Sequence, residues 1–542
     1  MRNWFLAIAA LGPIALAQPF DLVLAGGRIV DGMGNPWYRA DLGIRAGKIA
    51  AIGHLKGLAA TRVVDVHNQM IAPGFIDMMG ASSTPLLLDP ASSISKLSQG
   101  VTTIMAGEGN SEAPQNHRIF PGDAAAAGYH WTTFAEYFRL LDKRGVAINV
   151  IHNVGAAQVR RVVMGDEDRA PSPAELARMK DLVAQAMREG AIGISSALIY
   201  PPGVYAKTSE LIELAKAAAP FGGIYSTHMR NESFEVLNAV REAIAIGESA
   251  GVPVHIYHLK AAGQDNWPLM EKAIDLIRQA RARGLDITAD IYPYTRNGLG
   301  LTSFIHPRHF AQGAKPLLDS LKDPKVRAAL RREIESTSDW ENWYRHAGNN
   351  WDNVLVAEMA SHREYEGKSI AQIAALRRAD PWTTFFDLVG MGPVTVNPLS
   401  MDENQKRLAL RAEFISFCND QPPADPATVT NVHPRAFGSF PRVLGKYVRQ
   451  EHVISLEVAV RKMTSLAANA LELYDRGRIA PGMAADLVVF DPETVGDRAT
   501  YQRPLELSAG IHYVLVNGVI EMENNVWTHA LAGSVLRHQP LR

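Results

Sequence analysis

The sequence predicts an α/β protein: a TIM-like (β/α)8 barrel with a small β-sandwich built from both chain ends and an inserted helical subdomain. Three observations predict this fold class. Short apolar strands alternate with amphipathic helices through the middle of the 542-residue chain. Both chain ends instead carry short strands separated by glycine turns, a pattern typical of antiparallel sheets. Between about residues 309 and 378 the alternation stops and helical patterns follow one another.

The alternation of strands and helices is clearest between residues 221 and 290. Apolar strands are expected at 222–227, 252–257 and 285–290, with helices at about 233–250 and 267–283. Parallel strands need long connections, so this order predicts a parallel sheet. His228 and His258 directly follow the first two strands. Because barrel enzymes place their chemistry at the carboxyl ends of such strands, two histidines at equivalent positions predict a shared metal ion.

The remaining barrel elements follow the same rules. Strands are expected at 71–77, 101–105, 148–152, 192–196 and 414–417. A helix is expected after Ser172, where Ser-Pro-Ala-Glu forms a capping box with proline in the first turn, and Gly190 should end it. The barrel is therefore assigned to residues 71–468, with the insertion at about 309–378.

The two chain ends are assigned to the β-sandwich, as residues 18–70 and 469–542. In the first part, Ala25-Gly26-Gly27 separates two apolar runs and predicts a hairpin turn. In the second part, strands are expected at 486–490 and 513–520. Both parts differ from the parallel pattern of the barrel, so they are expected to pair with each other beside it.

Residues 1–17 have the form of a secretory signal peptide. A basic start at Arg2 precedes an apolar run from Trp4 to Leu16, and Ala15-Leu16-Ala17 offers a small-x-small cleavage site. The run is too short for a spanning helix. The mature protein is therefore expected to be exported, periplasmic or secreted, with no membrane association after the signal is removed.

Composition narrows the class of partner. The chain has 55 Lys and Arg against 56 Asp and Glu, so its net charge favours neither nucleic acid nor an anionic membrane as a partner. The single cysteine, Cys418, excludes an internal disulfide framework and a cysteine-rich zinc site. A small-molecule substrate is the expected partner, and the sequence indicates no oligomeric state.

The chain resembles the amidohydrolase superfamily, and within it the N-acyl-D-amino-acid deacylases (D-aminoacylases). The matching motifs occur in the family's order over nearly the whole chain after residue 17. They are Ala72–Asp77, Gln99–Thr103, Tyr200–Ala206, Thr227–Arg230, His258–Lys260, His433–Arg442 and Gly477–Asp486. The resemblance implies a (β/α)8 barrel with a split β-sandwich and an inserted segment. It also implies zinc-dependent hydrolysis of the amide bond of an N-acyl amino acid.

The chain departs from the family pattern at two places. Met79 and Ala81 stand where family members carry His-x-His, and neither side chain suits a zinc ion. Glu108 stands in the region where the deacylases commonly place a metal-ligating cysteine. We therefore expect one zinc ion, held by Glu108, His228 and His258, a set known from catalytic zinc sites with an open position for water.

The resemblance assigns further roles around this metal. Asp420, at the tip of the last barrel strand, matches the catalytic aspartate that acts as general base. Lys260, Tyr292 and Arg435 match the positions that hold the substrate's α-carboxylate. Arg230, two residues after His228, is a further candidate for the substrate-binding region.

Two alternatives remain open at the level of the sequence. The same fold could hydrolyse a cyclic amide or imide, or a dipeptide. The loss of His-x-His could instead mark a non-catalytic binding protein on an amidohydrolase scaffold. The joint presence of Glu108, His228, His258 and Asp420 favours the enzyme. The acyl group, the amino acid and its chirality are left open.

Overall fold

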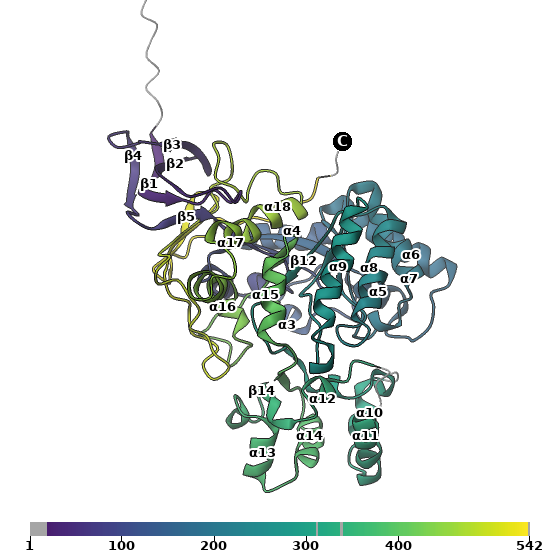
Figure 1. Ribbon diagram of the computed structural model, residues 1–542. Coiled ribbons are helices and arrows are strands. Elements are labelled where there is room, and N and C mark those ends of the chain that lie inside the picture. The colour runs from purple at the N-terminus through teal and green to yellow at the C-terminus, as the bar shows by residue number, and fades with distance from the viewer. Residues whose placement is uncertain (1–18, 311–312, 337–339, 540–542) are drawn as a thin grey trace, which may run out of the picture.

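The computed structural model describes residues 19–310, 313–336 and 340–539, in three parts: a barrel, a sheet from the two chain ends and an inserted segment (Figure 1). The signal peptide predicted at residues 1–17 lies outside the described residues. Within the described ranges, no helix is both long enough and apolar enough to cross a membrane.

The barrel is an eight-stranded parallel sheet, in the order β16-β12-β11-β10-β9-β8-β7-β6. Its strands are β6 (Phe75–Asp77), β7 (Val101–Ala106), β8 (Asn149–Gly155), β9 (Gly193–Ala197), β10 (Ile224–His228), β11 (Val254–Ile256), β12 (Ile287–Ile291) and β16 (Ile415–Phe417). The amide of Met78 donates to the carbonyl of Phe417 at 3.3 Å, which nearly closes the sheet between its first and last strands. The predicted barrel is confirmed.

Amphipathic helices cover the outside of the barrel. They include α4 (Phe134–Arg144), α5 (Ala156–Met164), α6 (Pro173–Glu189), α7 (Thr208–Ala218), α8 (Val236–Ala250), α9 (Leu269–Ala282), α15 (Glu403–Arg411) and α17 (Leu456–Met463). Helix α6 begins as predicted: the Ser172 side chain accepts from the Glu175 amide in a reciprocal capping box, and Gly190 ends the helix in the left-handed conformation.

Strands from both chain ends form one nine-stranded sheet. The first end supplies β1 (Phe20–Ile29), β2 (Tyr38–Arg45), β3 (Lys48–Gly53), β4 (Ala60–Asp65) and β5 (Met70–Pro73), and the second supplies β17 (Leu487–Phe490), β18 (Ile511–Val516), β19 (Val519–Glu523) and β20 (Val526–Trp527). The predicted union of the two ends is confirmed. The predicted hairpin at residues 25–27 is wrong: β1 runs through it, and one extra residue in β1 forms a bulge against β2.

The segment predicted as the first barrel strand, 71–77, is two strands. β5 pairs with β1 and β17 in the terminal sheet, whereas β6 pairs with β7 in the barrel. Gly74 lies between them, and a Cβ atom there would meet Thr102 Oγ1 at 2.2 Å. The close approach of this backbone to β7 therefore requires glycine at the point where the chain leaves one sheet for the other.

The inserted segment extends beyond the expected 309–378 and contains a sheet as well as helices. Its elements include β13 (Leu299–Gly300), α10 (Ala314–Ser320), α11 (Pro324–Ser336), α12 (Trp343–His346), β14 (Val354–Glu358), α13 (Ile370–Arg377), α14 (Pro381–Gly390) and β15 (Thr395–Pro398). The three strands form an antiparallel sheet in the order β13-β15-β14. Buried aromatic residues, among them Phe304, Trp351 and Phe385, give the segment its own core. It lies at one end of the barrel, opposite the terminal sheet (Figure 1).

Candidate metal centre

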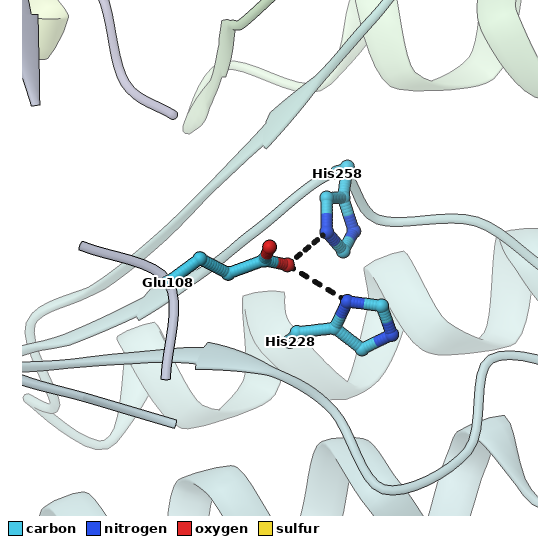
Figure 2. A group of neighbouring side chains, drawn as sticks. All are labelled: Glu108, His228 and His258. Atoms are coloured by element: carbon cyan, nitrogen blue, oxygen red, sulfur yellow. Dashed lines mark hydrogen bonds and ion pairs between the residues drawn. The ribbon is translucent and has the colours of Figure 1, made fainter. Parts of the chain in front are cut away.

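Three potential metal ligands converge from the carboxyl ends of three barrel strands, β7, β10 and β11 (Figure 2). Glu108 follows β7 by two residues, His228 is the last residue of β10, and His258 follows β11 by two residues. One carboxylate oxygen, Glu108 Oε1, lies 2.9 Å from His228 Nδ1 and 3.0 Å from His258 Nε2. One ligand atom from each residue lies within 4.8 Å of the others. The structure thus brings together all three predicted ligands.

The surroundings of these groups favour positive charge, whether a proton on His258 carries it or a metal ion that takes the place of that proton. Burial alone would raise the pKa of Glu108, but hydrogen bonds and charge from the two histidines outweigh it and lower the pKa to about 2. Burial and the Lys260 ammonium oppose protonation of His258, yet the surrounding carboxylates, with Glu232 foremost, raise its pKa to about 10. A carboxylate facing two imidazoles is a donor set that fits zinc, so the residues present fit the ion that the family resemblance implies.

A second carboxylate, Glu232, lies behind both histidines. Its Oε1 is 2.9 Å from His258 Nδ1, and its Oε2 is 3.5 Å from His228 Nε2. The Glu232 side chain is 1% exposed. A carboxylate in this position orients a ligating histidine and fixes which ring nitrogen faces the metal. Sequence reasoning missed Glu232, although its spacing of four residues from His228 was a usable signal.

A cluster of cationic side chains surrounds the ring of Tyr292. Arg435, Lys406 and Lys260 place their charged groups 4.5, 4.8 and 5.8 Å from the ring centre. Burial and the neighbouring Lys260 lower the pKa of Lys406 to about 7. Among the described residues, Tyr292 Oη is buried without a hydrogen-bond partner. Three of these residues were predicted to bind a carboxylate, and the structure gathers them; Lys406 was missed.

Asp420 lies beside this cluster, and its Oδ2 is 2.5 Å from Arg435 Nη1. Burial raises the pKa of Asp420, against the opposing charge of Arg435. Asp420 and Glu108 line the same cavity of about 210 Å³, together with His228, His258, Lys260 and Arg435. The candidate base therefore lines the same cavity as the candidate metal ligands.

Three residues that line this small cavity have left-handed backbone conformations. Ala81, His258 and Asp420 have φ angles of 56°, 35° and 50°. Such angles are unfavourable for residues with a side chain and persist where surrounding contacts hold them. At His258 one such contact is visible: the backbone amide donates to Asp290 Oδ1 at 2.7 Å.

The positions that lack the His-x-His pair lie at the same end of the barrel. Ala81 lines the small cavity, while Met79 is buried in an apolar cluster with Met78 and Met105. The backbone carbonyl of Met79 accepts from the Asp420 amide at 3.0 Å. Neither side chain here offers a nitrogen or oxygen ligand.

Arg230 lies outside the small cavity. Its guanidinium pairs with Glu242 at 2.9 Å and donates to the backbone carbonyls of Val204 and Ala206. It also lines a larger cavity of about 710 Å³, which shares Tyr200 and Trp343 with the small one. The role of Arg230 in substrate binding stays a prediction, because its donors are already engaged with protein groups.

The inserted segment closes one side of both cavities. Trp343, from α12, lines each of them. Nearby, Glu341 accepts from the backbone amide of Glu232. Burial and the charge of Glu232 raise the pKa of Glu341 to about 8. The insertion therefore contributes to the site rather than only extending the surface.

Comparison with known proteins agrees with this geometry. The amidohydrolase family model (Amidohydro_3) matches residues 62–521. D-aminoacylase from Alcaligenes xylosoxydans xylosoxydans is 37% identical over 525 residues, which cover 96% of this chain and 98% of that protein.

Solved structures show the same similarity. N-acyl-D-glutamate deacylase from Bordetella bronchiseptica, solved with zinc and a phosphonate mimic of the tetrahedral intermediate, has a TM-score of 0.81 at 33% identity. The match covers 96% of this chain and 100% of the deacylase chain. A D-aminoacylase structure described in terms of a binuclear centre with one-metal activation and second-metal attenuation has a TM-score of 0.80 at 33% identity, with coverage of 96% and 100%.

Proposed function

Because this chain belongs to the amidohydrolase family, we propose that it hydrolyses the amide bond of an N-acyl amino acid. The observation that carries the proposal is the convergence of Glu108, His228 and His258 beside a cation-rich wall. The relatives that deacylate N-acyl-D-amino acids support this assignment and favour a substrate of D configuration.

One zinc ion per chain would be held by Glu108, His228 and His258. When bound, zinc polarises the amide carbonyl and lowers the pKa of the attacking water to around 7. The absence of nitrogen or oxygen ligands in the side chains of Met79 and Ala81 supports one ion rather than two. Glu232 would keep both imidazoles oriented toward the ion.

Asp420 would act as the general base. It would take the proton of the attacking water and return it to the departing amine. A raised pKa suits this exchange, because a carboxylate that is too acidic would hold the proton too weakly to pass it on. Arg435 is close enough to stabilise the ionised form until the proton arrives.

The wall around Tyr292 would bind the α-carboxylate of the substrate. Lys260 and Arg435 supply positive charge, and a bound carboxylate would favour the protonated form of Lys406. The Tyr292 hydroxyl supplies a donor that no described residue uses. A charged hydrogen-bond acceptor fits such a buried cluster better than a neutral group does. The larger cavity beyond Tyr200 and Trp343 offers room for the rest of the substrate.

Export is part of the same proposal. The basic start, apolar run and Ala15-Leu16-Ala17 site support cleavage of a signal peptide after Ala17. Mass spectrometry of the protein recovered from outside the cytoplasm should find Gln18 as the first residue. Recovery of the uncleaved chain from the cytoplasm alone would contradict export.

A substrate screen tests the proposed activity. N-acetyl D- and L-amino acids, dipeptides and cyclic amides are offered to the purified protein with and without added zinc. We expect zinc-dependent release of free amino acid from the N-acetyl compounds, and faster release from the D series. Turnover confined to the cyclic amides, or no turnover at all, would overturn the proposal.

A further inference from the structure

The buried residue Lys96 lies next to the segment that carries the candidate base. It belongs to the short helix α2 (Ile94–Leu97) and has no exposed surface, 0%. The Lys96 ammonium contacts three acceptors: Asp77 Oδ2 at 2.8 Å, Asn419 Oδ1 at 3.1 Å and the Gln421 carbonyl at 2.8 Å. An ammonium has three donors, so these acceptors satisfy it fully.

Two of these acceptors flank Asp420 on either side. Lys96 holds the side chain of Asn419 and the backbone of Gln421, the residues immediately before and after the candidate base. Asp77 also fixes this segment, because its Oδ1 accepts a hydrogen bond from the backbone amide of Asn419 at 2.9 Å. The Asp420 amide itself donates to the Met79 carbonyl at 3.0 Å.

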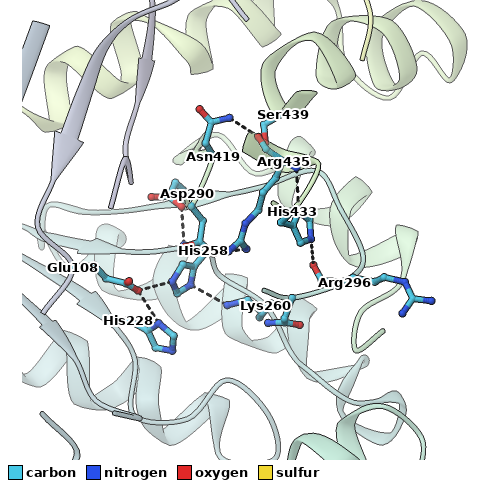
Figure 3. A network of polar contacts seen from close by, with 12 residues as sticks. Glu108, His228, His258, Lys260, Asp290, Arg296, Asn419, His433, Arg435 and Ser439 are labelled. Carbon is cyan, nitrogen blue, oxygen red and sulfur yellow. Dashed lines mark hydrogen bonds and ion pairs between the residues drawn. The ribbon is translucent and has the colours of Figure 1, made fainter. Parts of the chain in front are cut away.

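Further bonds fix Asn419 in place. Its amide nitrogen Nδ2 donates to Gln99 Oε1 at 3.0 Å and to the Arg435 carbonyl at 2.7 Å, the latter drawn in Figure 3. Asn419 is fully buried, with 0% exposure. The segment before Asp420 is therefore held by contacts that reach β6, α2 and the helix that begins at Arg435.

These contacts explain an otherwise unfavourable backbone. Asp420 has a φ angle of 50°, in the left-handed region, where a residue with a Cβ atom is stable only if its neighbours are held. The ion pair between Lys96 and Asp77 is itself buried, with both side chains 0% exposed. Burying two charges is unfavourable unless every donor and acceptor is satisfied, as they are here.

We propose that Lys96, through Asp77, Asn419 and Gln421, is a positioning residue that holds Asp420 in the conformation needed for catalysis. The inference rests on the proposed function, because it takes Asp420 as the general base. Lys96 does not line the small cavity. It acts through the backbone on either side of Asp420, and a misplacement of about 1 Å is enough to lower a rate about 100-fold.

The test compares four proteins on an N-acyl amino acid that the wild type hydrolyses: wild type, Lys96→Met, Asp420→Asn and Lys462→Met. Lys462 is the matched control, because it is also a buried lysine, 1% exposed, but it donates to the Ala412 carbonyl. We expect Lys96→Met to lower kcat about 100-fold while KM changes less than about twofold and zinc content stays at the wild-type value. Lys462→Met should leave kcat unchanged, even if its melting temperature falls.

A second variant keeps the test decisive if Lys96→Met does not fold. Asn419→Ala removes the hydrogen bond between Lys96 and the Asn419 side chain but leaves the Lys96–Asp77 ion pair in place. It should also lower kcat rather than raise KM, and a crystal structure should show a changed φ angle at Asp420. A wild-type protein that hydrolyses no N-acyl amino acid would overturn the proposed function itself. An active wild type with an inactive Asp420→Asn variant, but undiminished kcat in folded Lys96→Met or Asn419→Ala protein, would overturn this inference alone.

Discussion

At the scale of single residues, the site combines groups with opposite requirements. In the proposed reaction, Glu108 must stay ionised between two imidazoles, while Asp420 must exchange a proton. The structure separates them by environment: contact with the histidines lowers the pKa of Glu108, and burial raises that of Asp420. Opposite pKa shifts of two carboxyl groups in one cavity are typical of sites in which the two groups have different catalytic roles.

The hydroxyl of Tyr292 gives a clean test of carboxylate binding. Tyr292→Phe removes only that oxygen, which no described residue bonds, so the free energy of unfolding should change little. KM for an N-acyl amino acid should rise about tenfold, since a hydrogen bond to a charged group contributes about 1.5 kcal/mol. Steady-state kinetics measures the change. An N-acyl amine without a carboxylate is the control, and equal effects on both substrates would contradict the assignment.

Glu232 should govern how tightly the metal is held. Glu232→Gln removes the charge behind His258 and His228, so zinc affinity should fall about 10- to 100-fold, as it does for comparable carboxylate partners of ligating histidines. Competition with a zinc chelator measures it. Glu235→Gln is the matched control, because Glu235 lies three residues further on and is exposed. Identical zinc affinity in the two variants would show that Glu232 does not contribute to metal binding.

The residues of the site differ in how readily the sequence reveals them. Glu108, His228 and His258 follow recognisable strands, and the barrel rule alone places such residues together. Glu232 has only its four-residue spacing from His228 as a local signal, and Lys406 and Lys96 have none. The positions of these two lysines depend on contacts between distant segments. Lys96, for example, contacts Asn419, which lies 323 residues further along the chain. A single sequence does not contain that information in readable form.

At the scale of elements, a buried ion pair joins two barrel helices. Arg160 in α5 makes a two-pronged contact with Glu210 in α7, at 2.8 and 2.7 Å. Glu210→Ala should destabilise the protein by about 3–5 kcal/mol, because it leaves the Arg160 charge buried and unpaired. Denaturant unfolding measures this. Glu213→Ala, in the same helix but on a half-exposed pair with Lys180, should cost less than about 1 kcal/mol. Equal losses would contradict the prediction.

Elements with strong local signals match their predictions, and those without do not. The capping box at Ser172 and the glycine at 190 define α6 from sequence alone. The glycine pair at 26 and 27 has two possible meanings, a turn or a bulge, and only pairing with β2 decides between them. The sheet of the inserted segment was missed because its strands are short and pair across long connections, as β14 does with β15 across α13 and α14.

At the scale of the whole molecule, one polar cluster ties the terminal sheet to the barrel. Asp486, just before β17, accepts from Asn149 of β8 at 3.0 Å and from the Asn517 amide at 2.7 Å, and it pairs with Arg476. Asp486 is 4% exposed. The two parts of the fold are therefore expected to unfold together rather than separately.

Replacing Asp486 should weaken the whole molecule without altering its chemistry. Asp486→Ala removes the buried partner of Arg476 and leaves it only Asp475, whose side chain is 64% exposed, so the free energy of unfolding should fall by about 3 kcal/mol. Chemical denaturation followed by fluorescence should still show one transition, at lower denaturant, with kcat retained at 25 °C. Asp475→Ala, which removes the exposed partner of the same arginine, is the control. A loss of kcat with unchanged stability would contradict this role.

One zinc ion between Glu108, His228 and His258 is the claim on which the proposed activity depends. The most direct measurement strips the purified protein with a chelator and returns zinc in steps, following both bound metal and amide hydrolysis. Activity should rise in proportion to bound zinc and reach its maximum at about one ion per chain, and Glu108→Ala should neither bind this ion nor regain activity. Full activity in the stripped protein, a requirement for two ions, or unimpaired activity in Glu108→Ala would contradict it.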